Sequence, residues 1–178
     1  IIVVAHFEHW GDNLDYSAPY AVGEDEALVY NVVPTYAEVS TFEEVLDILP
    51  DVLVLGDSFE DNFPGFESAL PATLFGDESV VGYQIDWSDV GYYSAYGMYT
   101  VYMYAYTLSS TAASTAVTGL QGAGFVAANL TAFSTEPAGY WNATTHEFIM
   151  VGDYTSLYEC VILSEYVIFD AAFVTVAE

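Results

Sequence analysis

The sequence predicts a mainly β fold: long antiparallel strands in a sandwich-like or extended sheet, with one short helix. Three observations lead to this prediction. Several segments alternate apolar and polar residues with a period of two. Hydrophobic residues make up 54% and aromatic residues 17% of the 178 residues, enough to supply a core. No fixed-period repeat and no Pro/Gly/Ser-rich linker divides the chain, so we expect a single β-rich domain over residues 1–178.

The first elements follow from local composition. Residues 1–10 and Ala27–Val33 are rich in β-branched side chains and are predicted to be strands. Ser40 and Glu43 form an S-x-x-E capping box, and apolar residues follow at helical spacing. This pattern predicts a helix over residues 41–49.

The next segments are predicted from breakers and alternation. Pro50 is expected to end the helix, and Asp51–Leu55 is expected to be a short buried strand. Residues 58–75 contain several turn-forming residues. Residues 81–88 alternate apolar and polar side chains, which predicts a strand with one face in water.

Tyrosines concentrate in the segment Tyr92–Thr107, which is predicted to be one long strand covered on both faces. At roughly 3.3 Å per residue such a strand would span about 50 Å. Its even positions form a tyrosine ladder, which is either part of a sandwich core or a face that meets a neighbouring subunit. We favour the second interpretation, with an assembly face made of Tyr92, Tyr96, Tyr102, Tyr104 and Tyr106.

The last third of the chain returns to strand patterns. Residues 108–124 are almost all small, and are expected to form a loop, a tight crossing or a small-residue helix. Strands are predicted at Phe125–Phe133, Glu147–Val151 and Leu157–Phe169. Both faces of the last strand are expected to be largely covered, although Glu159 and Glu165 share one face with its apolar residues.

The charge of the chain excludes several functions. It has 26 acidic residues and neither lysine nor arginine, so its formal net charge is −26. Nucleic-acid binding needs clustered cationic side chains, so nucleic-acid partners are not expected. Mechanisms that use a Walker A lysine or an arginine finger are also excluded. The acids divide the chain into an acidic half (1–89), an uncharged stretch (90–135) and C-terminal strands (136–178).

Several features favour an extracellular, cell-surface location. The chain begins at Ile1 and is interpreted as a processed product. Sequons at Asn129 and Asn142 make these two residues candidate glycosylation sites. Proteases that cut after Lys or Arg would find no site, so we expect protease resistance. No apolar run is long enough for a transmembrane helix, and membrane insertion is not expected.

Metal binding is predicted with little specificity. The motif His6-Phe7-Glu8-His9 matches no known zinc spacing and is interpreted as strand-end histidines. No cofactor is expected, although divalent cations such as Ca²⁺ would suit carboxylates in turns. The candidate calcium ligands are Glu24, Asp25, Glu26, Asp57, Glu60 and Asp61.

The segment 52–58, Val-Leu-Val-Leu-Gly-Asp-Ser, resembles the first block of the GDSL/SGNH hydrolases. This resemblance implies Ser58 as a nucleophile at the end of a strand. The chain lacks the Gly-x-Asn-Asp block of that family and its late Asp-x-x-His pair, since residue 143 is Ala. A triad needs its base and the group that orients it, so we predict no catalytic residues and no enzyme activity.

Cys160 is the single cysteine. It is either a small buried hydrophobe or a bridge between two subunits. An acidic, Tyr/Ser/Thr/Ala-rich β chain with one cysteine and sequons resembles archaeal surface polymers, such as the tubular sheath proteins of methanogens or archaeal pili and threads. The resemblance implies a cross-linked, resistant β-sheet assembly with Cys160 as the candidate intermolecular disulfide.

Together these features predict a structural, self-assembling subunit of an extracellular filament, tube, sheath or surface lattice. Its partners would be copies of itself, joined by β-sheet contacts. The alternative is a secreted Ca²⁺-dependent carbohydrate-binding or adhesion module that uses tyrosines and tryptophans as platforms. A GDSL-like hydrolase is the third hypothesis.

Overall fold

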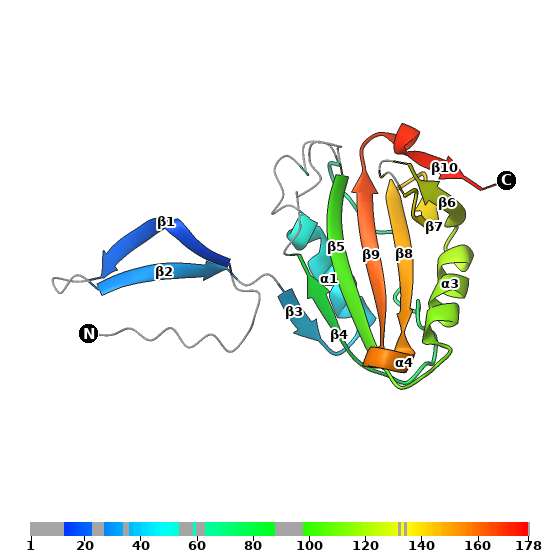
Figure 1. Ribbon diagram of the computed structural model, residues 1–178, viewed down its shortest axis with the longest axis horizontal. Coiled ribbons are helices and arrows are strands. Elements are labelled where there is room, and N and C mark those ends of the chain that lie inside the picture. Colours follow the sequence, from blue (N-terminus) through cyan, green and yellow to red (C-terminus); the bar gives the residue numbers. More distant parts are fainter. Residues whose placement is uncertain are drawn as a thin grey trace.

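A computed structural model describes residues 13–22, 27–33, 36–53, 59, 63–87, 98–131, 133 and 135–177, the first two ranges by their backbone alone. Strands β1 (Asn13–Val22) and β2 (Ala27–Val33) pair antiparallel in a two-stranded sheet. The other strands form one larger sheet (Figure 1). They are β3 (Tyr36–Val39), β4 (Val80–Asp86), β5 (Met98–Thr107), β6 (Val126–Leu130), β7 (Ala138–Asn142), β8 (Glu147–Tyr154), β9 (Cys160–Ile168) and β10 (Val174–Val176).

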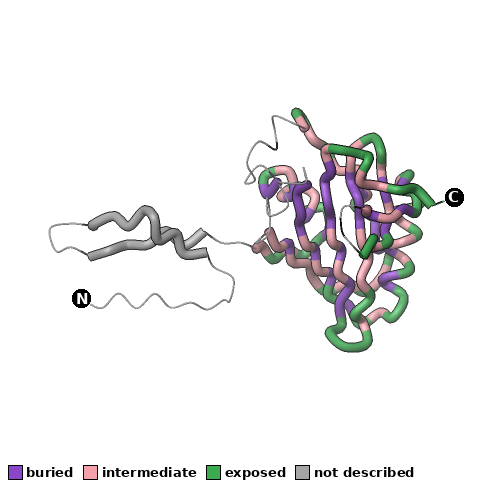
Figure 2. The backbone as a smooth tube through the Cα atoms, turned by 45° about the horizontal axis from the view of Figure 1, so that its top comes forward, coloured by how far each residue is buried: buried purple, intermediate pink, exposed green. Residues whose placement is uncertain are grey.

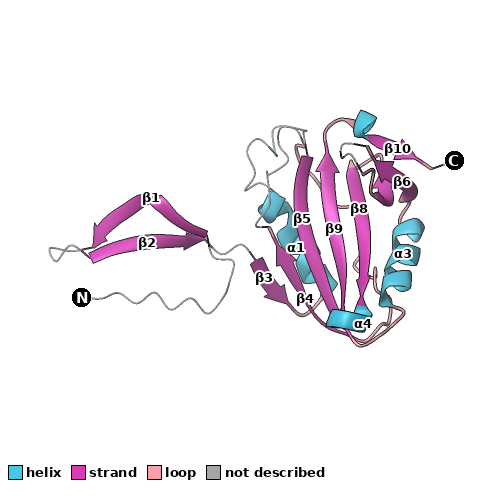
Figure 3. Cartoon of the chain, in the orientation of Figure 1, coloured by secondary structure: helices cyan, strands magenta, loops and turns pink. Residues whose placement is uncertain are grey.

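The larger sheet confirms the predicted fold class. Its eight strands follow the order β10-β6-β7-β8-β9-β5-β4-β3, and every neighbouring pair is antiparallel (Figure 3). The central strands β5, β9 and β8 are 10, 9 and 8 residues long, above the usual five or six. The extended-sheet form of the prediction therefore describes the molecule, while a single domain over residues 1–178 stays a prediction.

Two helices cover one face of this sheet, α1 (Phe42–Leu53) and α3 (Ala112–Gly122). The main core contains residues of both helices and of the strands. Figure 2 shows the buried residues concentrated along the central strands. Strand β5 contributes its odd positions to this core, namely Tyr99, Val101, Met103 and Ala105. The structure also contains the short helix α4 (Thr155–Tyr158) and the 3-10 turn η2 (Ala171–Phe173).

The predicted helix exists, but its capping box is shifted by one residue. Thr41 Oγ1 accepts a hydrogen bond from the Glu44 amide at 3.2 Å. The Glu44 carboxylate accepts in return from the amides of Thr41 and Ser40, both at 2.9 Å. The box is therefore Thr41–Glu44 rather than Ser40–Glu43, because both pairs fit the same motif and the buried face of α1 selects between them.

Pro50 does not end this helix, and the predicted strand over Asp51–Leu55 is wrong where the chain is described. Helix α1 continues through Pro50 to Leu53. A proline inside a helix costs about 3 kcal/mol. Val52 and Leu53 are 2% and 0% exposed, and burying two such side chains contributes roughly 3–6 kcal/mol. Core burial therefore outweighs the local penalty.

Of the three alternatives for residues 108–124, the small-residue helix is correct. Helix α3 buries Ala112, Ala116 and Leu120 against the core. Its Gly119 lies so close to the segment between α1 and β4 that an added Cβ would be 2.7 Å from the Leu74 backbone oxygen. The small side chains thus let α3 approach this segment and the strand β8 beneath it.

The strand predictions hold for most of the described chain. Strand β2 coincides with the predicted Ala27–Val33, and β4, β6 and β8 lie at the predicted places. The last strand begins at Cys160 rather than Leu157, since α4 occupies residues 155–158. Residues 1–10, predicted as a strand, lie outside the described residues.

A smaller second core lies on the sheet face opposite α1 and α3. Phe148, Tyr166 and Ile168 form its centre. Phe133, Phe173 and Val174 pack against them, so the returning C-terminal segment closes this end of the face. The other end of the same face carries the candidate site.

Candidate assembly face and buried carboxyl pair

The candidate site is the part of the sheet face that lies opposite the helices and beyond the second core. On β5, Tyr102 stands opposite Ser164, Tyr104 opposite Ile162 and Tyr106 opposite Cys160 of β9. Strand β8 continues these rows with Met150, Gly152 and Tyr154. We call this surface the tyrosine face; it comprises Tyr102, Tyr104, Tyr106, Met150, Tyr154, Ile162 and Ser164.

The tyrosine face is partly open to solvent. Tyr106 and Tyr154 are 37% and 41% exposed, and the other members are half-buried. Figure 1 shows β5, β9 and β8 side by side, and the described helices α1 and α3 do not lie over this face. The Tyr106 hydroxyl donates to Gln84 Oε1 at 2.9 Å, which fixes that ring against β4.

Charge is absent from this face among the described residues of β5, β8 and β9 that point to it. Acidic residues begin at its border, with Asp86 on β4 and Glu38 on β3. Burial raises the pKa of the Tyr104 hydroxyl, and the nearby Asp86 charge adds to the shift. Burial likewise raises the pKa of Tyr106, so these phenols stay neutral across the physiological range.

The structure places three of the five predicted assembly tyrosines together. Tyr102, Tyr104 and Tyr106 point to one face, as their alternation predicts. That face is open at this end, whereas the sequence analysis expected cover on both sides of the strand. Tyr92 and Tyr96 lie outside the described residues.

The sheet also presents two outer edges. Strand β3 ends the order on one side and β10 on the other, and they are only four and three residues long. Glu38 is exposed on β3. Short edge strands resist unspecific pairing with other sheets, and the charge of Glu38 adds to this effect on β3.

Cys160 is buried within the tyrosine face, at 4% exposure. Its register neighbours Tyr106 and Tyr154 flank it on β5 and β8. Burial raises the pKa of its thiol, which lowers the reactive thiolate fraction. A buried thiol is poorly accessible to a second chain, so this burial favours the buried hydrophobe of the two interpretations.

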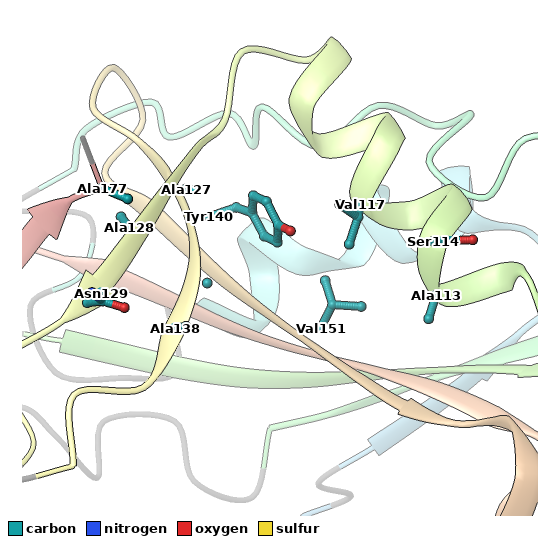
Figure 4. A pocket seen from close by; sticks show the side chains of 11 residues that line it. Ala113, Ser114, Val117, Ala127, Ala128, Asn129, Ala138, Tyr140, Val151 and Ala177 are labelled. Atoms are coloured by element: carbon teal, nitrogen blue, oxygen red, sulfur yellow. The ribbon is translucent and has the colours of Figure 1, made fainter.

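The predicted glycosylation sites differ in their surroundings. Asn142 Oδ1 accepts a hydrogen bond from the Thr144 amide at 2.9 Å and so shapes the β7–β8 turn. Asn129 lines a groove of about 440 Å³ between α3 and the strands β6 and β7 (Figure 4). Both side chains are half-buried. The predicted calcium ligands and Ser58 lie outside the described residues, within which no group of three metal-ligating side chains occurs.

Apolar and small side chains line most of that groove. Figure 4 shows Tyr140, Val117 and Val151 around it, with small residues completing the wall. No acid, histidine or cysteine is among its lining residues.

A feature that the sequence analysis missed is a pair of carboxyl groups in the core. Glu147 and Glu165 are both 0% exposed and lie on the helix side of β8 and β9. Glu165 stands opposite Ile149, and Glu147 is two residues from Ile149 on the same face, so the two acids are diagonal neighbours. The sequence feature that could have indicated the pair is an acidic residue, Glu165, among apolar residues on one face of the last predicted strand.

Comparisons with known proteins leave the chain without a family. No family model, no curated protein and no solved structure matches it. Within the described residues, the helices are too short or too polar to cross a membrane.

Proposed function

We propose that the chain is a structural subunit that assembles with copies of itself through the tyrosine face. The observation that carries the proposal is a neutral, aromatic, partly open surface on a chain with a net charge of −26. Tyrosine is enriched where protein surfaces meet, because its ring buries a large area at low entropic cost. An uncharged patch is also the surface on which two such acidic chains repel each other least.

The charge of the chain sets the conditions for assembly. Carboxylates at about 10 Å repel by roughly 0.4 kcal/mol per pair in water, and salt screens them beyond roughly 8 Å. Contacts between copies are therefore expected to strengthen in high salt, in acid or with divalent cations. The acidic remainder of the surface would keep the finished polymer hydrated. An extracellular sheath, filament or lattice fits these properties.

A pair of matched serine variants tests the proposal. Ser164 lies half-buried in the middle of the tyrosine face, and Ser114 is exposed on α3 at the other side of the sheet. Ser164→Asp adds a carboxylate at each contact and is expected to abolish assembly. Ser114→Asp adds the same charge elsewhere and is expected to leave assembly intact.

Sedimentation velocity and negative-stain microscopy at high salt, with and without Ca²⁺, give the readout, and circular dichroism checks that both variants fold. If wild-type chains stay monomeric under every condition, the proposal is wrong. If the two variants assemble equally well, the tyrosine face is not the contact.

A further inference from the structure

The Glu147 and Glu165 carboxyl groups have very different surroundings. Glu147 accepts three hydrogen bonds: from Ser68 Oγ, from Thr145 Oγ1 and, at 2.7 Å, from the Ala69 amide. Three donors aimed at one carboxylate stabilise its charged form. In the described structure, neither Glu165 carboxyl oxygen has a hydrogen-bond partner, although both oxygens are fully buried.

The chain contains neither lysine nor arginine, so no ammonium or guanidinium side chain can neutralise this pair. Two ionised carboxylates buried side by side would each lose hydration and repel the other. A buried charge without a partner costs several kcal/mol, so one acid of the pair must be neutral.

We propose that the pair Glu147–Glu165 is a proton-binding site in which Glu165 carries one proton toward the ionised Glu147, and that the folded sheet depends on this proton. Glu165 is the acid that lacks donors, and a protonated carboxyl can itself donate to Glu147. The site is independent of the tyrosine face, which lies on the opposite side of the sheet.

The titration of Glu165 agrees with this geometry. Burial raises its pKa well above the ordinary value, and the negative charge of Glu147 raises it further. An unfolded glutamic acid releases its proton near pH 4.3. Between that value and the raised pKa, the folded chain holds one proton more than the unfolded chain. Stability therefore decreases as the pH rises through this window.

Few other groups in the described part of the chain could bring a positive charge close to Glu147 and Glu165. The ring of His146 lies against Phe63 and Trp141, with centroids 5.6 and 5.8 Å apart, and its Nδ1 donates to the Ile168 carbonyl at 2.9 Å. On the described elements around the pair, the titratable groups are Tyr99 on β5, Tyr140 on β7, Glu67 in the loop above, His146 in the β7–β8 turn, and the exposed acids Glu43, Glu44, Asp47 and Asp51 of α1. Of these side chains, only that of His146 can become positively charged.

Infrared spectroscopy of the full chain tests the proposal, because a protonated carboxyl has a C=O stretch distinct from that of a carboxylate. At pH 7 the wild type should show one protonated carboxyl. The Glu165→Gln variant has a side chain of nearly the same shape that can still donate a hydrogen bond to Glu147. It has no carboxyl group at this position, so the band of the protonated carboxyl should disappear. The matched control Glu67→Gln removes an exposed acid of the loop that covers the pair, and should keep it.

Urea denaturation across pH gives the second readout. Between pH 5 and the pKa of Glu165, the folding equilibrium constant of the wild type should decrease with pH relative to that of Glu165→Gln. The ratio of the two constants should fall about tenfold for each pH unit. Glu67→Gln should follow the wild type. The proposal is overturned if no protonated carboxyl is present in the wild type at pH 7, or if the band survives in Glu165→Gln.

Discussion

Helix α3 packs against Leu74, in the segment between α1 and β4. For the substitution Gly119→Ala, this contact and intrinsic helix propensity predict opposite changes in stability. Replacing Gly119 by Ala should stabilise a helix by about 1 kcal/mol if nothing lies nearby. Here the new Cβ would be 2.7 Å from the Leu74 backbone oxygen and 3.1 Å from its Cδ1. A backbone atom cannot rotate away, and overpacking of this kind costs about 1–3 kcal/mol. We therefore expect a net loss of about 1 kcal/mol.

Gly122 provides the matched control in the same helix. Nothing lies within 4 Å of the Cβ that Gly122→Ala would add, so this variant should gain a few tenths to about 1 kcal/mol. The two variants should thus differ by roughly 1–2 kcal/mol. With a urea m-value near 2 kcal/mol/M, their denaturation midpoints should be separated by about 0.5–1 M. Equal stabilisation by both substitutions would show that α3 does not pack on Leu74.

Three further predictions concern single groups. Hydrogen bonds from Ser109, Thr111 and Thr115 lower the pKa of Glu78, so wild-type stability should fall as the pH drops below about 4, and Glu78→Gln should flatten this acid limb in urea denaturation. Thr41→Ala should cost about 1 kcal/mol in thermal unfolding because it removes the cap of α1, whereas Ser40→Ala should cost far less, and the reverse order would restore the Ser40–Glu43 box. Cys160 should react with a thiol reagent only after denaturant is added; rapid labelling of the native chain would contradict its burial.

Local patterns in the sequence were enough to predict the strands at the centre of the sheet. The alternation of Tyr102, Tyr104 and Tyr106 with apolar residues specifies which side chains share a face. The Ala27–Val33 strand follows from its β-branched content. Such patterns can be recognised in the sequence because all side chains on one face of a strand share the same environment.

Other features depend on tertiary contacts and were not predictable. Pro50 is a helix breaker by local rules, yet the burial of Val52 and Leu53 keeps the helix intact. Glu147 and Glu165 are 18 residues apart in the chain, and only the β8–β9 register places them side by side. The openness of the tyrosine face likewise depends on where α1 and α3 pack, which no residue of β5 specifies.

The central claim is that the tyrosine face is where copies of the chain meet. Hydroxyl-radical footprinting of the full chain, diluted and concentrated at high salt, measures this directly by the oxidation of individual tyrosines. Tyr106 and Tyr154 should become protected on concentration, whereas Tyr140, which lines the groove beside α3, should not change. Unchanged oxidation of Tyr106 and Tyr154 in an assembled sample would contradict the account.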